Sequence, residues 1–201
     1  MKRIFAMLLA AAMLGCSAAQ PASAAQETAV FAGGCFWGVE AVFEHVKGVI
    51  DVRSGYAGGQ KETAEYETVS EGNSGHAESV EVRFDPAKVS YEQLLEVFFT
   101  VVHDPTQLNR QGPDVGTQYR SAIFFMNEKQ KTAAEAYISK LKVSKAFSQP
   151  IVTEVSELKQ FFSAEDYHQD YMKKNPEDPY IVYHDVPKVK ALKEKFSALY
   201  K

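Results

Sequence analysis

The stretch from Thr28 to Gly38 reads Thr-Ala-Val-Phe-Ala-Gly-Gly-Cys-Phe-Trp-Gly, and it joins a predicted strand to a predicted helix. The strand is expected over residues 28–32, and apolar side chains at helical spacing predict the helix over residues 36–46. The two glycines before Cys35 allow a tight turn and the close approach of a ligand. A cysteine at a helix start feels unpaired amide groups and the positive end of the dipole, which favour the thiolate. Cys35 is therefore a candidate nucleophile, and a buried structural cysteine is the alternative.

The first 25 residues are typical of a secretion signal. Lys2 and Arg3 precede an apolar run over residues 4–14, which is too short to span a membrane and fits a signal-peptide core. In one interpretation Leu-Gly-Cys ending at Cys16 is a lipoprotein box, and Cys16 is lipidated. In the other, Ala-Ser-Ala before Ala25 is an ordinary cleavage site. Both predict a periplasmic location in the bacterial cell envelope, with a lipid anchor at Cys16 as the only expected membrane attachment.

Residues 26–201 are long enough for a single domain with a substantial core. The net charge of −4 comes from interspersed residues of both signs, so no nucleic-acid partner is expected. Because Cys16 is either acylated or removed, Cys35 has no intramolecular partner for a disulfide. An unpaired thiol in an oxidising compartment favours a reactive role for Cys35.

The remaining elements follow from apolar periodicity and from capping signals. Strands are expected over residues 48–56, 78–85, 119–126 and 151–155, and long polar loops over residues 60–75 and 103–118. Helices are expected over residues 90–102, opened by a capping box of Ser90 and Gln93, over 128–147, over 163–173, and from Pro187 onward. This order predicts an α+β fold, a two-layer sandwich with a ferredoxin-like core, excursion loops and a C-terminal helical tail.

Five motifs in this order resemble those of the A-type peptide methionine sulfoxide reductases, the MsrA family. They are Gly-Gly-Cys-Phe-Trp-Gly-Val-Glu at Gly33 to Glu40, Gly-Tyr-Ala-Gly-Gly at Gly55 to Gly59, Gly-His-Ala-Glu at Gly75 to Glu78, His-Asp-Pro-Thr-Gln-Leu-Asn-Arg-Gln-Gly at His103 to Gly112 followed by Asp-Val-Gly-Thr-Gln-Tyr-Arg-Ser at Asp114 to Ser121, and Glu-Asp-Tyr-His-Gln at Glu165 to Gln169. The five motifs span the whole expected domain in the family's order.

The resemblance implies that the Cys35 thiolate attacks the sulfur of methionine sulfoxide. Glu78 holds the family's acid position and would protonate the departing oxygen, which requires a raised pKa. Tyr66 and Tyr119 occupy the positions whose phenols hydrogen-bond that oxygen. The products would be methionine and a Cys35 sulfenic acid.

The remaining implied roles concern substrate binding. Phe36 and Trp37 would form the apolar pocket for the substrate methyl group, and Asp114 would contact the substrate near its backbone. His168 lies in a family motif and is given a supporting part. The resemblance also implies selectivity for the S epimer, in oxidised proteins and peptides and in free methionine sulfoxide.

The residues alone leave other interpretations open. Phe36 and Trp37 could be ordinary core aromatics, Glu78 a solvent-facing carboxylate, and Tyr66 and Tyr119 half-buried surface tyrosines. Arg110 and Arg120 are interpreted as structural ion-pair partners. His76 with Glu78, or His103 with Asp104, could suggest a metal site, but the spacing typical of metal ligands is missing. No metal and no cofactor is expected.

The sequence departs from many relatives in having no cysteine after Cys35. A sulfenic acid at Cys35 therefore requires an external thiol, from a thioredoxin-like or glutaredoxin-like partner or a small thiol. Without that thiol it risks overoxidation to the sulfinic acid. The protein is expected to be a monomer.

Two competing functions remain. A cysteine hydrolase or acyltransferase would use His76 or His168 as a base and would need an oxyanion hole. An envelope lipoprotein that binds peptides through its aromatic residues would need no chemistry at Cys35.

Overall fold

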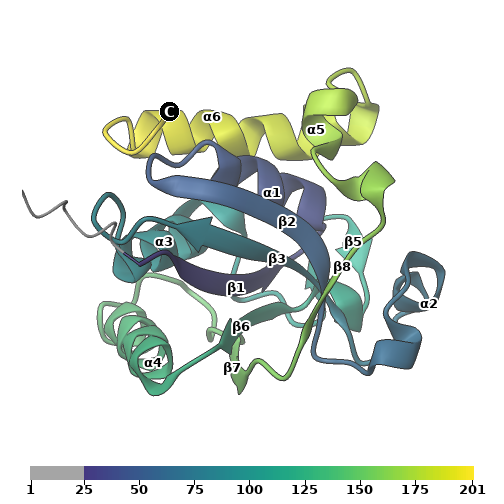
Figure 1. The fold of residues 1–201 in the computed structure, drawn as a ribbon. Coiled ribbons are helices and arrows are strands. Elements are labelled where there is room, and N and C mark those ends of the chain that lie inside the picture. Colours follow the sequence, from purple (N-terminus) through teal and green to yellow (C-terminus); the bar gives the residue numbers. More distant parts are fainter. Residues whose placement is uncertain (1–24) are drawn as a thin grey trace, which may run out of the picture.

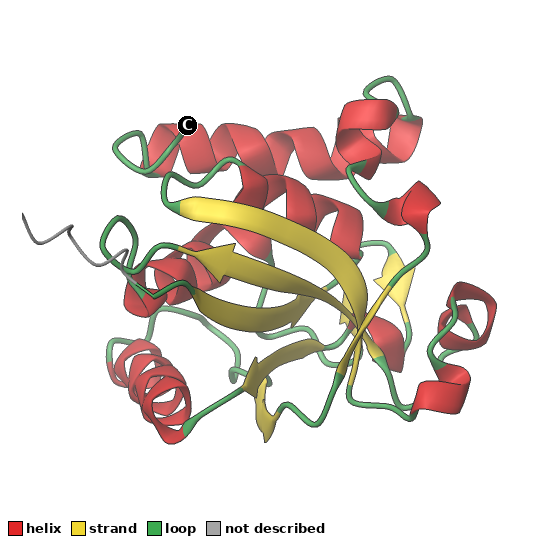
Figure 2. Ribbon diagram, in the orientation of Figure 1, coloured by secondary structure: helices red, strands yellow, loops and turns green. Residues whose placement is uncertain are grey.

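The computed structural model describes residues 25–201, which form one curled sheet with helices packed against it (Figures 1 and 2). The secretion signal expected over residues 1–25, with Cys16, lies outside the described residues apart from Ala25. Within the described part of the chain, no helix is long and apolar enough to cross a membrane.

The sheet has six strands in the order β7-β6-β1-β3-β2-β8. Their bounds are Glu27–Gly33 (β1), Val49–Ala57 (β2), Ala77–Phe84 (β3), Ser121–Phe125 (β6), Glu154–Glu157 (β7) and Phe161–Ser163 (β8). The four central strands, β6-β1-β3-β2, are all antiparallel, whereas β7 runs parallel to β6. Strands β4 (Arg110–Gln111) and β5 (Asp114–Val115) form a separate hairpin. The order and directions of the central strands confirm the ferredoxin-like core.

The helices connect and flank these strands. They are α1 (Phe36–Glu44), α2 (Tyr66–Ser70), α3 (Tyr91–Val97), α4 (Glu128–Val143), α5 (Tyr171–Lys174) and α6 (Val186–Lys195), with π-helical turns at Phe98–Val102 and Ile181–Asp185 and 3₁₀ turns at Lys61–Thr63, Thr117–Tyr119 and Asp166–His168. The predicted capping box is present, because Ser90 Oγ accepts the Gln93 amide while the Gln93 side chain accepts the Ser90 amide. The α+β class is therefore confirmed.

The main core lies between the sheet and helices α1 and α3. Phe31 on β1 stacks on Phe43 of α1 and on Phe98 after α3, with ring centroids 5.2 and 5.0 Å apart. The opposite face of the sheet is lined mostly by alanines, and the segment leading into β8 crosses it (Figure 1). Leu158 of that segment and Phe161 at the start of β8 cover this face. This packing holds the end of β1, and hence Cys35, between two layers.

The helix predicted over residues 163–173 is wrong in its first half. Ser163 instead ends strand β8 and pairs with Gly55 of β2. The Gln169 side chain then bonds both backbone groups of Ser54, accepting its N–H at 3.0 Å and donating to its carbonyl at 3.0 Å. Asp170 adopts a left-handed conformation with φ of 53°, which ends the preceding turn. In this segment, hydrogen bonds from the Gln169 side chain to the backbone of β2 take the place of backbone hydrogen bonds within a helix.

Other predicted boundaries also differ from the structure. The strand expected over residues 151–155 is β7, which starts only at Glu154, and the helix expected over residues 128–147 ends at Val143. The polar loop over residues 60–75 contains α2, whose five residues include only one buried side chain, Val69. Its short length explains why no apolar period was visible. The strand predicted from Tyr119 begins at Ser121, because residues 117–119 form a 3₁₀ turn.

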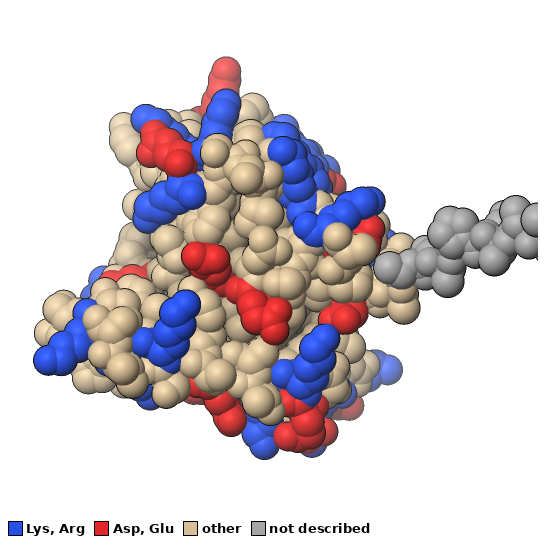
Figure 3. Space-filling view, turned by 90° about the vertical axis from the view of Figure 1, so that its left-hand side faces the viewer, with Lys and Arg blue, Asp and Glu red and all other residues tan. Residues whose placement is uncertain are grey.

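Charged residues of both signs are interspersed on the face of the molecule seen in Figure 3, which shows the left-hand side of Figure 1. No continuous basic surface is visible on that face. This pattern agrees with the overall charge of −4.

Candidate active site

Cys35 lies at the junction between β1 and α1, as the sequence predicts. It is the N-cap residue of α1, and its side chain is 8% exposed. Gly34 makes the turn with φ of +94°, and a Cβ atom at this position would lie 2.7 Å from the side chain of Gln111. Only glycine fits this conformation without strain, so the turn requires the residue found there.

The structure overturns the expectation that the helix start favours the thiolate. Burial raises the pKa of the Cys35 thiol well above its usual value, and the carboxyl groups of Glu78 and Asp185 raise it further. The Trp37 amide, which donates to the sulfur, and the Lys188 ammonium act in the opposite direction. Desolvation therefore outweighs the amides at the helix start, and the resting thiol holds its proton at neutral pH.

Glu78 lies on β3 with its carboxyl group beside the first turn of α1. Its side chain is buried, and its Oε2 accepts a hydrogen bond from the Phe36 amide at 3.0 Å. Burial raises the pKa of Glu78 to about 8, the charge of Asp114 adds to this, and the Phe36 amide opposes it. At neutral pH most of the carboxyl group is protonated, so Glu78 is not the solvent-facing carboxylate of the alternative interpretation.

Trp37 and Phe36 form part of an aromatic cluster held together by His168. The Trp37 indole Nε1 donates to His168 Nδ1 at 3.1 Å, and the imidazole ring lies 4.9 Å from the Phe36 ring. Tyr171 stacks flat on the indole with centroids 3.7 Å apart, while Tyr180 meets it edge-on at 6.0 Å. Burial lowers the pKa of His168, so its ring is neutral and can accept this hydrogen bond. The cluster thus fixes the orientation of Trp37.

Tyr66 reaches the same cluster although it comes from the predicted loop. Its ring lies 4.4 Å from that of His168. Its amide donates to Glu165 at 2.9 Å, and the second carboxylate oxygen of Glu165 accepts the Tyr56 hydroxyl at 2.8 Å. Glu165 therefore ties the start of α2 to the sheet.

The phenols of Tyr66 and Tyr119 stay protonated. Burial raises the pKa of Tyr66 to about 12, and burial also raises that of Tyr119; the charge of Glu78 adds to both. Asp114, on the β4–β5 hairpin, accepts a hydrogen bond from the Tyr180 hydroxyl. The electrostatic influence of Asp114 on Glu78 and Tyr119 places it in the same environment. The structure thus brings together all eight residues that the sequence singled out.

Four further residues join this site from the C-terminal segment. They are Tyr171, Tyr180, Asp185 and Lys188. The sequence analysis placed Tyr171 in the helix expected over residues 163–173 and the other three in the C-terminal helical tail, and it gave none of them a functional role. No local signal distinguishes these four residues from the other tyrosines and charges of the tail, because their contacts with the first turn of α1 form only when the chain folds.

His103 and His76, the two histidines weighed as metal ligands, are engaged in structural contacts. His103 bonds the Phe98 carbonyl at 3.0 Å and Ser121 Oγ at 2.7 Å. His76 accepts the Gly59 amide at 3.3 Å and lies 2.9 Å from the Gln60 carbonyl. Both rings already use their two nitrogens, so neither is free to act as a base. Among the described residues, no group of three or more His, Cys, Asp or Glu side chains is arranged to hold a metal ion.

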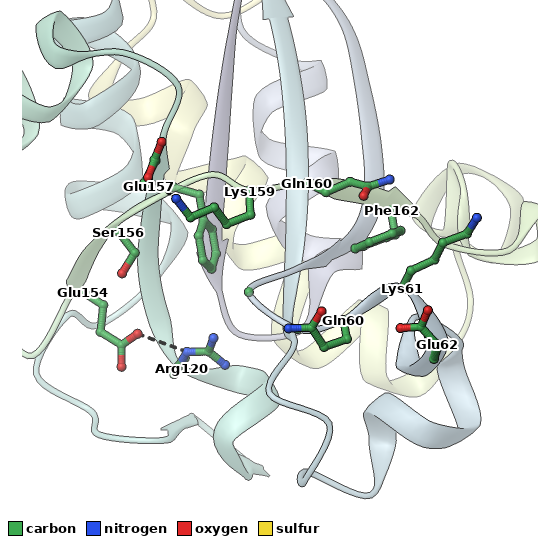
Figure 4. Close-up of a pocket in the computed structure, with 13 residues that line it drawn as sticks. Gln60, Lys61, Glu62, Arg120, Glu154, Ser156, Glu157, Lys159, Gln160 and Phe162 are labelled. Carbon is green, nitrogen blue, oxygen red and sulfur yellow. Dashed lines mark hydrogen bonds and ion pairs between the residues drawn. The ribbon is translucent and has the colours of Figure 1, made fainter.

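One cavity lies away from this site, and none of the eight predicted residues lines it (Figure 4). It has a volume of about 540 Å³ and contains Lys61, Glu157 and Lys159 among its charged lining residues. Arg120 crosses one wall, pairing with Glu154 at 3.2 Å and donating to the His76 and Gly75 carbonyls at 3.0 Å. These bonds confirm the structural role expected of Arg120.

Comparisons with known proteins agree with this geometry. The family model of the peptide methionine sulfoxide reductases matches residues 27–200. MsrA 2 of Mesorhizobium japonicum is 58% identical over 181 residues, which is 90% of this chain and 93% of the relative. The reduced form of Mxr1 from Saccharomyces cerevisiae superposes with a TM-score of 0.71 and 32% identity, covering 79% of this chain and 89% of Mxr1. Methionine sulfoxide reductase A of Corynebacterium diphtheriae gives a TM-score of 0.67 and 36% identity over 79% of this chain and 77% of its own. The chain belongs to the peptide methionine sulfoxide reductase family.

Proposed function

We propose that Cys35 reduces methionine S-sulfoxide to methionine, with Glu78 as the proton donor. Membership in the family makes the chain an oxidoreductase that acts on sulfur, a peptide-methionine (S)-S-oxide reductase. The observation that carries the proposed mechanism is the buried Glu78 carboxyl group, hydrogen-bonded to the residue that follows Cys35. A neutral acid next to a buried thiol suits a reaction that needs a nucleophile and a proton donor together.

The proposed step balances without any other reactant. The Cys35 sulfur bonds to the sulfur of the sulfoxide as the sulfur–oxygen bond breaks, and the departing oxygen takes up the Glu78 proton and the Cys35 thiol proton and leaves as water. Water then attacks the Cys35 sulfur, the sulfur–sulfur bond breaks, methionine leaves, and one proton of that water returns to Glu78. Methionine has gained the two electrons that Cys35 has lost, and Cys35 is left as a sulfenic acid.

The other residues would bind the substrate around these two groups. Trp37 is half-buried and would contact the methyl group of the substrate, with the buried Phe36 ring packed behind it, and His168 keeps the indole in place. The phenols of Tyr66 and Tyr119 would donate hydrogen bonds to the sulfoxide oxygen as negative charge develops on it. Asp114 would contact the substrate backbone, on a hairpin that is partly exposed.

The sulfenic acid would be reduced by an external thiol. Cys35 is the free cysteine of the described residues, and the sequence contains no other cysteine apart from Cys16. Attack of a thiol on the Cys35 sulfur releases water and forms a mixed disulfide, which a second thiol reduces. The yeast relative Mxr1, which has been solved in complex with Trx2, supports a thioredoxin-like partner. A glutaredoxin-like protein or a small thiol would serve the same chemistry.

We also propose where the enzyme works and on what. The predicted secretion signal places it in the bacterial cell envelope, periplasmic and anchored if Cys16 is lipidated, as a monomer. Its substrates would be oxidised proteins and peptides together with free methionine sulfoxide.

The decisive experiment omits the reductant. Incubated with each epimer of a methionine sulfoxide peptide, the enzyme should form about one methionine per chain from the S epimer only and gain about 16 Da at Cys35. Dithiothreitol should then restore turnover, and Cys35→Ser should form no methionine. An unchanged Cys35 with no methionine would refute the proposal, and peptide binding that persists in Cys35→Ser would then favour a binding protein.

A further inference from the structure

The C-terminal segment places a buried ion pair beside the first turn of α1. The side chain of Asp185 is fully buried, and its Oδ1 lies 3.2 Å from Lys188 Nζ. The second oxygen of Asp185 has no hydrogen-bond partner among the described residues. Burying a carboxylate with only one partner costs free energy, so this arrangement calls for an explanation beyond stability.

Gly38 shows how closely this pair approaches the helix that carries Cys35. A Cβ atom at Gly38 would lie 2.0 Å from Asp185 Oδ1 and 2.8 Å from Lys188 Nζ, so a side chain there would displace the pair. Gly38 follows Cys35 by three positions, and residues three apart share one face of a helix. The two opposite charges therefore lie on the face of α1 that also carries the thiol.

We propose that Asp185 and Lys188 are positioning residues for the nucleophile, and that their opposite charges set how readily the Cys35 thiol ionises. The inference rests on the proposed function, in which Cys35 is the nucleophile. The anion of Asp185 disfavours a thiolate nearby, whereas the cation of Lys188 favours it. With both side chains packed against Gly38, the Asp185 carboxylate helps to keep the resting thiol protonated. The Lys188 ammonium stabilises the negative charge that develops on the sulfur during attack.

Other titratable groups also face the thiol or the pair. They are Glu78 on β3, Asp114 on the β4–β5 hairpin, His184 beside Asp185, the phenols of Tyr66, Tyr119, Tyr171 and Tyr180, and His103 near Lys188. Burial raises the pKa of Asp185, and the Lys188 ammonium opposes this and favours the anion. At neutral pH these phenols are protonated because burial raises the pKa of each. His103 is neutral because burial lowers its pKa to about 4. Glu78 is mostly neutral below its pKa of about 8. Asp185 and Lys188 therefore supply the charges that act on the thiol from its own face of the helix.

Three variants test this proposal by the sign of their effects. The pH dependence of Cys35 alkylation by iodoacetamide reports the apparent pKa of the thiol. Lys188→Met should raise that pKa by about one unit, which means about tenfold less thiolate at a given pH below it. Asp185→Asn should lower it by a similar amount. The double variant should lie between the two single variants.

A matched control comes from the same helix. Lys190 is exposed and pairs only with Glu194, at 3.8 Å, so Lys190→Met should leave the alkylation profile unchanged. The double variant also guards against misfolding, because it removes both buried charges and leaves no unpaired ion. Far-UV circular dichroism checks that each variant keeps its fold.

Opposite signs for the two single variants would support the proposal, and equal signs or no shift would overturn it. A merely structural ion pair predicts equal signs, because either substitution breaks the same contact. Alkylation needs no sulfoxide, whereas methionine formation does. If the two variants shift the thiol pKa in opposite directions but the enzyme forms no methionine, this inference is supported and the proposed reaction is refuted.

Discussion

Replacing Glu78 with glutamine removes its acidic proton but keeps the size of the side chain and its hydrogen-bond acceptor. The amide oxygen of glutamine can still accept the Phe36 hydrogen bond, which measures 3.0 Å in the structure. The variant has no acidic proton to give to the sulfoxide oxygen, and a positioned general acid typically contributes about 10² to 10⁴ in rate. We therefore expect Glu78→Gln to slow single-turnover methionine formation by about that factor, with Cys35 still present as a thiol.

The same substitution should change how stability depends on pH. The pKa of Glu78 is raised from 4.5 to about 8 in the folded protein. The folded state therefore holds the proton more tightly than the unfolded state, and this contribution to stability is complete below pH 4.5 and lost as the pH rises through 8. At about 1.4 kcal/mol per pKa unit, the difference amounts to up to about 5 kcal/mol. Glutamine does not titrate, so the variant should lack this loss.

Urea unfolding at pH 6 and pH 9 measures the effect. The wild type should lose more stability than Glu78→Gln over this interval, by about 3 kcal/mol, because about two pH units of it lie below the folded pKa of about 8. Glu81→Gln should follow the wild type. Glu81 makes a suitable control because it lies on the same strand, is half-buried, and faces the other side of the sheet. Parallel stability profiles for wild type and Glu78→Gln, or an undiminished rate of methionine formation, would refute the assignment of Glu78 as a buried neutral acid.

Three further substitutions address single contacts. Trp37→Phe keeps an aromatic ring against Tyr171 but loses the hydrogen bond to His168. KM for a methionine sulfoxide peptide should therefore rise more than kcat falls, and an unchanged KM would argue against a substrate-binding role for Trp37. Tyr66→Phe should lower the single-turnover rate about tenfold without changing the thiol pKa measured by alkylation, and an unaltered rate would exclude its phenol from the reaction. Ser90→Ala should cost about 1 kcal/mol in urea unfolding by removing the capping box and leave the single-turnover rate unchanged.

The elements predicted correctly are those whose signal is local. The glycines before Cys35 predict the turn, and the side chains of Ser90 and Gln93 predict the start of α3 by a reciprocal bond within four residues. Strand β3 alternates between apolar and polar residues because one of its faces packs on the helices. Motif resemblance then predicted a shared site, and the structure brings those residues together.

The missed features depend on contacts between distant segments. Strand β8 is only three residues long, and its pairing with β2 is supported by the Gln169 side chain on Ser54, about a hundred residues away in sequence. Asp185 and Lys188 are spaced like any exposed pair on a helix surface, and only their packing against Gly38 gives them a role. The protonated state of the Cys35 thiol was also missed, because the helix start is visible in the sequence whereas the degree of burial is not.

The far end of α1 is held by the last residues of the described chain, and this has a practical consequence for handling the protein. The Lys201 amide donates to the His45 carbonyl at 2.9 Å, the Lys47 amide donates to Leu199 at 2.6 Å, and Val46 bridges to Tyr200. Helix α1 is thus fastened at both ends by the C-terminal segment. A variant that lacks residues 199–201 would lose these contacts, which anchor the helix that carries Cys35. Shortened forms of the enzyme should therefore keep this segment.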